Sequence, residues 1–409
     1  MIETSAATHD VGGVLLERPF KIRRIGHFGV NAVRMEECVR FYTEELGFRI
    51  SDLLDFSQRT KPELIAGLGD PNGHFLHHGT DHHSFVIFNK RVHEASGRGT
   101  PGSEVVMNQI SWQVGSLAEV VNGNSWLTAE GLHMERGGRD MPGSNWNTYF
   151  LDPDGQTNEI FYGMEQVGWD SRSKPMAMWD ERRFRAQPEL PQPSEDDEIR
   201  DSVRRGTPLD TGSALRDALP GHDYDVEGIL LPRPFKIIKV GPIGLFVRDI
   251  DATTRFYTHV LGLCVSEETV WNGKRCVFLR ANTEHHTIAL YPIELRATLG
   301  VRADSTTFSL GFQVGTYRQL CDARDFLAKR GATFVEIPPE LHPGIDYAFH
   351  ITDPDGQAVQ LYFSMEQIGW DGRTRPPASR PNPKPGAWPA TLPGEPDVYG
   401  GETLLGPLG

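Results

Sequence analysis

The feature that most constrains the fold of this chain is an internal duplication. The first copy opens GVLLERPFKI, and the second opens GILLPRPFKI, with Phe20 and Phe235 in matching places. The copies also close alike, as DPDGQTNEIFYGMEQVGWD and DPDGQAVQLYFSMEQIGWD, where Met164 matches Met365. Similarity at both ends of a segment of about 150 residues indicates a repeated structural unit. The 409 residues therefore predict two domains of one architecture.

Each copy divides again into two rounds of one pattern. A short apolar strand, IGHFGVNAV, leads into a helix whose apolar positions Met35, Cys38, Val39 and Tyr42 recur at helical spacing, and Gly47 ends this helix. Strand-like runs such as FRISDLLDF and HSFVIFNK follow, and a second round begins at MNQISWQV. In that round Asp-Pro-Asp-Gly is a turn that makes TYFL and NEIFYG a hairpin. We therefore predict an α+β fold of four tandem βαβββ modules, two in each copy.

Irregular segments separate and follow the two copies. The first copy covers residues 14–170 and the second covers residues 229–372. Residues 171–225 are rich in proline and charge, and we expect a linker that crosses one surface, with a short helix near residues 194–205. Residues 373–409 contain nine prolines and no pattern. This tail is expected to be disordered or to form an extended arm on a partner subunit.

The charge of the chain limits its partners. Forty-one basic against 55 acidic residues give a formal net charge of −14. This balance argues against nucleic-acid binding, which depends on Lys and Arg neutralising phosphates. Part of the acidic excess lies in the linker run SEDDEIRD, so an uncharged or weakly charged small molecule is the expected partner.

The sequence also favours a cytoplasmic protein without a membrane anchor. No stretch approaches the ~20 apolar residues of a membrane span. The opening MIETSAATHDVGG has neither the basic start nor the apolar run of a secretory signal. The four cysteines are scattered without a C-x-x-C pair, which is typical of reduced, mostly buried thiols rather than of disulfides or a zinc ribbon.

Three motifs link the modules to a known family. They are G-H-x-x-x-x-x-V in the first strand, F-Y-x-x-x-L-G-F at the end of the first helix, and D-P-D-G-x-x-x-E-I in the last hairpin. Together they resemble the vicinal oxygen chelate superfamily, and the R-P-F-K-I lead-in makes the chain most similar to its type I extradiol ring-cleaving dioxygenases. The resemblance covers both copies, and it implies a U-shaped mixed sheet in each. A homo-oligomer is expected.

The resemblance implies a metal site in the first copy, held by His27, Gln109 and Glu159. An imidazole and a carboxylate with open positions suit Fe(II) and oxygen chemistry. Gln109 stands where the family has a second histidine, and its neutral amide oxygen favours a harder ion, so Mn(II) or another divalent metal is the alternative to Fe(II). The structural alternative is that each of the three is a buried polar group that pairs locally.

The second copy provides an internal control for this site. The residues that match the three candidate ligands are Pro242, Ser309 and Gln360. None of these is a strong metal ligand. We therefore expect the second copy to be structural or a regulatory relic.

Three further residues are candidates for catalysis by resemblance. His83, in Asp-His-His-Ser, matches the family's acid/base histidine, and a neutral imidazole suits that role. However, Glu-His-His-Thr stands at the matching place in the second copy, so the pair could equally serve the fold. Tyr149 matches a tyrosine that hydrogen-bonds a substrate oxygen, and a packed core aromatic is the alternative. Asp140 replaces a family histidine. Arg139, Asn145 and Trp146 lie in the same loop and could shape the pocket, although a surface turn rich in Gly and Asn is the default expectation.

These residues support three hypotheses for function. The first is a metal-dependent dioxygenase that cleaves a catechol-like aromatic ring with O2, in which Tyr149 stabilises developing negative charge. The second is a lyase or isomerase of the superfamily that uses a harder metal as a Lewis acid. The third is a non-enzymatic binder of an aromatic ligand.

Overall fold

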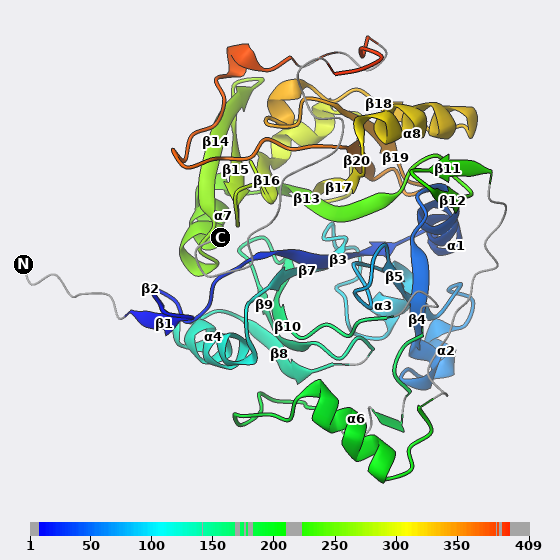
Figure 1. Ribbon diagram of the computed structural model, residues 1–409, viewed down its shortest axis with the longest axis vertical. Coiled ribbons are helices and arrows are strands. Elements are labelled where there is room, and N and C mark those ends of the chain that lie inside the picture. Colours follow the sequence, from blue (N-terminus) through cyan, green and yellow to red (C-terminus); the bar gives the residue numbers. More distant parts are fainter. Residues whose placement is uncertain are drawn as a thin grey trace, which may run out of the picture.

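Two eight-stranded mixed sheets form the body of the molecule (Figure 1). The structure is a computed structural model. It describes residues 8–140, 142–167, 172–175, 177–178, 183–209, 223–381, 383 and 387–392.

The first sheet has the strand order β4-β5-β6-β3-β7-β10-β9-β8. Its strands are β3 (Arg24–Ala32), β4 (Arg49–Asp55), β5 (Asn72–His77), β6 (Phe85–Asn89), β7 (Met107–Gln113), β8 (Met134–Arg139), β9 (Trp146–Leu151) and β10 (Thr157–Tyr162). The helices of this half are α1 (Met35–Arg40), η1 (Phe41–Glu45), η2 (Phe56–Gln58), α2 (Pro62–Ile65), α3 (Lys90–Ala95) and α4 (Leu117–Ala129). The order β3-α1-β4-β5-β6 followed by β7-α4-β8-β9-β10 confirms two βαβββ modules.

The second sheet repeats this order as β14-β15-β16-β13-β17-β20-β19-β18. Its strands are β13 (Ile237–Val247), β14 (Cys264–Trp271), β15 (Lys274–Arg280), β16 (Ile288–Pro292), β17 (Thr307–Val314), β18 (Phe334–Val335), β19 (Ala348–Thr352) and β20 (Ala358–Tyr362). The helices are α7 (Ile250–Arg255), η4 (Phe256–Val260), η5 (Ile293–Thr298), α8 (Tyr317–Lys329), η6 (Pro339–Leu341) and η7 (Pro377–Ser379). The predicted α+β fold of four modules is confirmed. A two-stranded hairpin precedes each sheet: β1 (His9–Val11) with β2 (Val14–Leu16), and β11 (Tyr224–Val226) with β12 (Ile229–Leu231).

The repeated R-P-F-K-I segment is held by the cap of a helix in each copy. Ser116 accepts a hydrogen bond from the Glu119 amide at the start of α4, and the Glu119 carboxylate accepts one from the Lys21 amide. In the second copy Gln319 of α8 accepts the amide of Lys236 in the same way. A capping residue followed three positions later by Glu or Gln satisfies free amides of a helix start. Here the same side chain also holds the lead-in segment beside the start of the helix.

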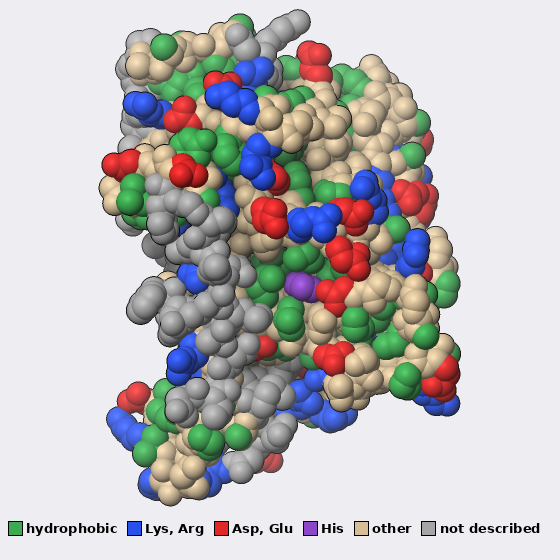
Figure 2. Space-filling model, turned by 90° about the vertical axis from the view of Figure 1, so that its right-hand side faces the viewer, with side chains coloured by type: hydrophobic (Ala, Val, Ile, Leu, Met, Phe, Trp, Pro, Cys, Tyr) green, Lys and Arg blue, Asp and Glu red, His purple; other side chains and the backbone are tan. Residues whose placement is uncertain are grey.

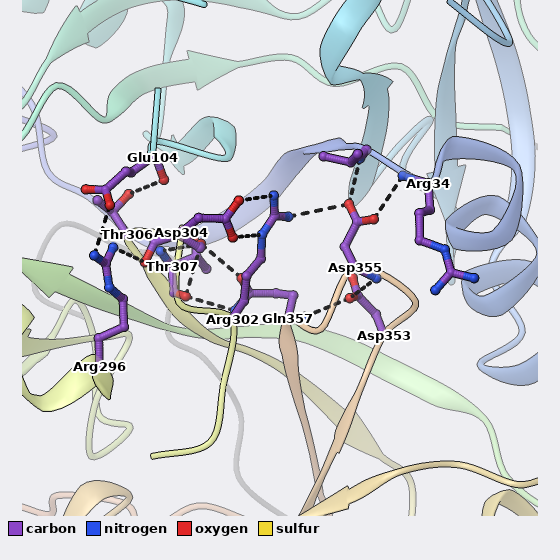
Figure 3. Close-up of polar contacts among 12 residues, drawn as sticks. Arg34, Glu104, Arg296, Arg302, Asp304, Thr306, Thr307, Asp353, Asp355 and Gln357 are labelled. Atoms are coloured by element: carbon purple, nitrogen blue, oxygen red, sulfur yellow. Dashed lines mark hydrogen bonds and ion pairs between the residues drawn. The ribbon is translucent and has the colours of Figure 1, made fainter. Parts of the chain in front are cut away.

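The two copies dock through reciprocal contacts made by the D-P-D-G turns. Tyr257 donates a hydrogen bond to Asp152 at 3.0 Å, and Tyr42 donates one to Asp353 at 3.0 Å. Asp355 accepts the backbone amides just before α1, and it also lies near Arg302 (Figure 3). The tyrosine of F-Y-x-x-x-L-G-F and the aspartate of D-P-D-G are therefore docking residues of the duplicated fold, which we call the Tyr–Asp contacts.

The segments outside the two sheets also pack on the chain itself. The expected linker helix is present as α6 (Glu195–Arg204), and its Glu198 forms a buried bidentate ion pair with Arg139 at 2.7 and 3.1 Å. In the described part of the tail, Trp388 contacts Tyr317 and Phe349 of the second copy. This described stretch therefore packs on its own chain, while the expectation for the tail as a whole stays a prediction.

Three further findings concern the helices, the thiols and one face of the surface. In the described part of the chain, no helix has the length and apolar character that a bilayer crossing requires. All four cysteines are free thiols. On the face shown in Figure 2, the described Lys and Arg side chains are interspersed with Asp and Glu.

Candidate active site

A single row of cross-strand neighbours on one face of the first sheet carries most of the candidate residues. His27 on β3 lies opposite Ser111 on β7, and Ser111 lies beside Glu159 on β10. Glu159 pairs with Tyr149 on β9, and Tyr149 pairs with Arg136 on β8. Residues in register across a sheet point to the same face. The topology therefore brings together His27, Glu159 and Tyr149, which are far apart in the sequence.

His27 and Glu159 form the buried centre of this row. Both side chains have no exposed surface, and His27 Nε2 lies 3.0 Å from Glu159 Oε2. Their approach lacks hydrogen-bond geometry, so both ring nitrogens of His27 have no hydrogen-bond partner among the described residues. A buried polar atom without a partner is costly in a folded protein. A cation bound between the His27 nitrogen and the Glu159 oxygen would give both atoms a partner, including the nitrogen that otherwise has none among the described residues.

Two neighbours orient the Glu159 carboxylate. Asn145 Nδ2 donates a hydrogen bond to Oε1 at 2.6 Å, and the Ser111 hydroxyl donates one to Oε2. Asn145 is only 3% exposed and lines the cavity, which fits the expectation that it shapes the pocket and not the alternative of a surface turn. Its bond to Glu159 was not predicted, because this contact forms only when β9 and β10 pair.

Gln109 stands on the same face as His27. The register pairs Gly29 with Gln109 and His27 with Ser111, so the two side chains share a face two residues apart along the ladder. Gln109 is buried and lines a cavity beside this row, and no described residue hydrogen-bonds its side-chain amide. Its amide oxygen is therefore available to a ligand.

The cavity beside this row has a volume of about 390 Å³. The part of the cavity near His27 and Glu159 is lined by His83, Gln109, Asn145 and Tyr149, and we call it the polar end. The other walls carry apolar, basic, acidic and neutral polar side chains. Those further lining residues include Leu54, Arg59, Phe75, Phe88, His93, Arg98, Asn108, Glu135, Arg136, Asp140, Pro142 and Thr157. His27 and Glu159 lie behind the polar end rather than on the cavity surface.

His83 faces the cavity and packs against His27. The two rings have centroids 4.4 Å apart, and His83 Nδ1 lies 3.1 Å from His82 Nδ1. Burial lowers the pKa of His83 well below its usual range, and the neighbouring His27 and His82 lower it further. His83 is therefore a neutral imidazole at physiological pH.

Tyr149 and Asp140 take different positions in the cavity. Tyr149 is 4% exposed, and burial raises the pKa of its phenol well above the usual value, with Glu159 adding to the shift. The phenol therefore keeps its proton and can donate a hydrogen bond. Asp140 lies toward solvent and forms an ion pair with Arg136 at 3.1 Å, and Arg136 in turn lies over the Tyr149 ring. Two residues, Arg136 and Tyr149, thus lie between Asp140 and Glu159.

The matching face of the second copy has no comparable site. Pro242 packs closely on Gly311, which pairs with Gln360, and Gln360 pairs with His350. The cavity lined by Pro242, Ser309 and Gln360 has a volume of only about 10 Å³. Within the described ranges, the side chains of the second copy themselves fill the space on this face of the sheet.

The residues of the first copy fit a divalent cation. His27 offers an unpartnered buried nitrogen, Glu159 a carboxylate oxygen, and Gln109 a free amide oxygen. Among the described residues, no three or more His, Cys, Asp or Glu side chains cluster so that they could hold a metal. Of the three candidate ligands, only His27 and Glu159 belong to these residue types, and the third is the glutamine Gln109.

The family of the chain follows from its sequence as well as its fold. Residues 24–160 and 239–361, more than half of the chain, match the Glyoxalase/Bleomycin resistance protein/Dioxygenase superfamily. The chain belongs to this superfamily, and each copy contributes one matching region.

Two curated relatives resemble part of the chain. It is 27% identical over 133 residues to 2,2',3-trihydroxybiphenyl dioxygenase of Sphingomonas paucimobilis, which is 32% of this chain and 44% of the relative. It is 29% identical over 146 residues to metapyrocatechase 2 of Cupriavidus necator, which is 36% of this chain and 38% of the relative. Each match spans less than half of the relative's length.

Solved structures share the fold over most of the chain. The Mn(II)-bound glyoxalase from Novosphingobium aromaticivorans aligns with a TM-score of 0.52 at 15% identity, over 86% of this chain and 85% of that one. A catechol 2,3-dioxygenase aligns with a TM-score of 0.51 at 18% identity, over 86% and 91%. At these identities the likeness shows the two-domain fold alone.

Proposed function

We propose that this chain is a metal-dependent extradiol-type dioxygenase that cleaves a catechol-like aromatic ring with O2. The observation that carries the proposal is the buried contact of His27 with Glu159 behind a cavity whose polar end includes His83 and Tyr149. The similarity to a trihydroxybiphenyl dioxygenase supports the reaction class. The proposed metal ligands are His27, Gln109 and Glu159, with Fe(II) as the metal and Mn(II) or another divalent ion as the alternative.

The chain's own residues have separate tasks in this proposal. A bound metal would supply Lewis-acid and redox chemistry toward a substrate with two vicinal oxygens. His83, held neutral by burial, accepts the proton of a substrate hydroxyl at its ring nitrogen. Tyr149, held protonated by burial, donates a hydrogen bond to the substrate oxygen on which negative charge develops. Phe75, which packs against His83 with ring centroids 5.0 Å apart, excludes water from the aromatic ring.

A second candidate function is proton transfer with the metal as a Lewis acid, as in a lyase or isomerase. Gln109 favours this second function, because Gln109 and Glu159 would supply hard oxygens as two of the three ligand atoms. Here His83 would move a proton between two carbons of a bound enediolate, without O2.

Oxygen uptake separates the two functions. Protein purified anaerobically and supplied with Fe(II) should consume O2 and destroy the aromatic absorbance of at least one vicinal diol from a panel of catechols. Protein loaded with Mn(II) serves as the comparison. Full metal loading with no oxygen uptake for any diol would reject the dioxygenase and leave the Lewis-acid function. The expected homo-oligomer stays a prediction, which the molar mass in solution would test.

A further inference from the structure

The cavity of the first copy has a basic mouth that the proposed reaction does not use. Arg59 follows η2, Arg98 follows α3, and Arg136 lies on β8, so three separate elements bring a guanidinium to one cavity. Two acidic residues, Glu135 and Asp140, also line it. The chain as a whole is acidic, so this concentration of arginine is local.

Two of the three arginines make no direct ion pair within the described ranges, although Asp140 of the same cavity attracts both of them. Asp140 pairs with Arg136 at 3.1 Å. No hydrogen bond or ion pair joins Arg59 or Arg98 to a carboxylate in the described part of the chain, and Arg98 instead lies over the Phe56 ring at 5.0 Å. Arg59 and Arg98 are both exposed, and both line the cavity.

The arginines also crowd one another. Burial lowers the pKa of Arg59, and the guanidiniums of Arg183 and Arg98 lower it further, although Asp140 opposes this shift. Burial and Arg136 lower the pKa of Arg98 in the same way, and Asp140 again opposes the shift. Like charges held together in this way are relieved by an anion, and guanidinium binds carboxylate through two parallel hydrogen bonds.

We propose that the substrate is an anionic aromatic vicinal diol whose carboxylate is bound by Arg59 and Arg98 while its diol faces His83 and Tyr149. The placement of the diol at His83 and Tyr149 rests on the proposed function. The placement of the carboxylate rests on the arginines alone. A cavity of about 390 Å³ holds an aromatic ring with a short acidic side chain. The proposed ligand is an anion, which differs from the uncharged or weakly charged partner expected from the net charge of the chain. The sequence did not show this, because the arginines are dispersed along the chain.

Matched acid and ester ligands test the proposal. The probes are 3,4-dihydroxyphenylacetate and its methyl ester, and phenylacetate and its methyl ester, with dissociation constants measured anaerobically by calorimetry. Within each pair we expect the acid to bind about tenfold more tightly, since a charge-assisted contact is worth that much. The preference should weaken at high ionic strength, because the arginines face solvent.

Arginine variants of the full chain assign the effect to the mouth. Arg59→Gln with Arg98→Gln should abolish the preference for the acids and leave the affinity for the esters unchanged. Arg91→Gln, in an exposed residue of α3 that does not line the cavity, should keep the preference. Equal binding of acid and ester by the wild-type protein, or an equal loss for both ligands in the double variant, would overturn the proposal.

The outcome is separable from that of the proposed function. If phenylacetate is preferred over its ester but no diol supports oxygen uptake, the anion site stands and the dioxygenase fails. If the diol acid and its ester are cleaved with equal kcat/KM, the dioxygenase stands and the anion site fails.

Discussion

The two copies of the duplicated unit share a frame and differ in what the frame encloses. Both have the same strand order, the same cap on the second helix and the same Tyr–Asp contacts. The first encloses His27 and Glu159 beside a cavity of about 390 Å³. The second has Pro242 and Gln360 in the matching places, beside a cavity of only about 10 Å³. Because the second copy folds without these groups, the frame does not need them. The buried imidazole and carboxylate of the first copy, which are costly to bury, therefore indicate function.

The largest expected difference concerns the histidine pair found in both copies. His83 and His286 lie in the same geometry, with Nδ1 atoms 3.1 and 3.0 Å from the preceding histidine. If His83 moves a proton, His83→Gln should lower kcat about 10²–10⁴-fold, with metal content unchanged, and His286→Gln should leave kcat at the wild-type value. Steady-state kinetics and metal analysis check this. Equal effects of the two substitutions would mean that the pair serves the fold in both copies.

The next effect concerns the packing of the linker on the first copy. Glu198→Ala leaves Arg139 charged and buried beneath α6, so the free energy of unfolding should fall by about 3–5 kcal/mol. Arg200→Ala on the same helix is the control: it removes an exposed pair with Asp196 and should cost at most about 1 kcal/mol. Chemical denaturation measures both. Hydrogen exchange should increase in the first sheet of the Glu198 variant and stay unchanged in the second; a uniform increase would contradict this assignment.

The Tyr–Asp contacts predict a pH dependence shared by the copies. Burial raises the pKa of Asp152 and of Asp353 to about 7, with nearby Asp154 and Asp355 adding to the shift, although the donated tyrosine hydroxyls and, for Asp353, Arg302 oppose it. The folded chain thus keeps two protons that the unfolded chain releases near pH ~4. This stabilisation is complete below pH ~4 and is lost as the pH rises through about 7, by about 1.4 kcal/mol per pH unit for each group.

Isosteric variants test the sign of this dependence. Asp152→Asn and Asp353→Asn cannot ionise, so each should remove part of the slope in the free energy of unfolding between pH 5 and 7. Denaturation at several pH values measures the slope. An unchanged slope in the double variant would show that the two carboxyls are already ionised in the folded chain.

The smallest expected effect concerns the metal ligand that departs from the family. Gln109→His replaces an amide oxygen by an imidazole and should strengthen Fe(II) binding roughly tenfold. Ser309→His, at the matching place in the second copy, should not add a binding site, because Pro242 and Gln360 offer no further strong ligand. Metal titration measures both. Loss of metal from a folded Gln109→His protein would place Gln109 outside the ligand set.

Most of the fold could be predicted from the sequence, because repeats and strand patterns are local signals. The hairpin at Asp152, the helix that ends at Gly47 and the four modules follow from such signals. The residues His27 and Glu159 were predicted by resemblance, and the structure places them in contact. Ser111 was missed, and Asn145 was expected only as a residue that could shape the pocket, because their bonds to Glu159 depend on strand register and on the fold of a loop.

The basic mouth and the docking of the copies could not be predicted for a related reason. Arg59 and Arg98 lie on separate elements with no shared motif. Tyr42 was assigned to a helix core, and its hydroxyl in fact reaches Asp353 of the other copy. Contacts between distant elements carry no periodicity, so only the assembled structure shows them.

The central claim is that the first copy alone holds a metal. Elemental analysis of anaerobically purified protein, after equilibration with Fe(II), tests it most directly. We expect about one equivalent per chain, lost in His27→Ala and Glu159→Ala, since these supply the two strong ligands, and kept in Gln360→Ala. Two equivalents per chain, or metal retained by both His27→Ala and Glu159→Ala, would contradict the account.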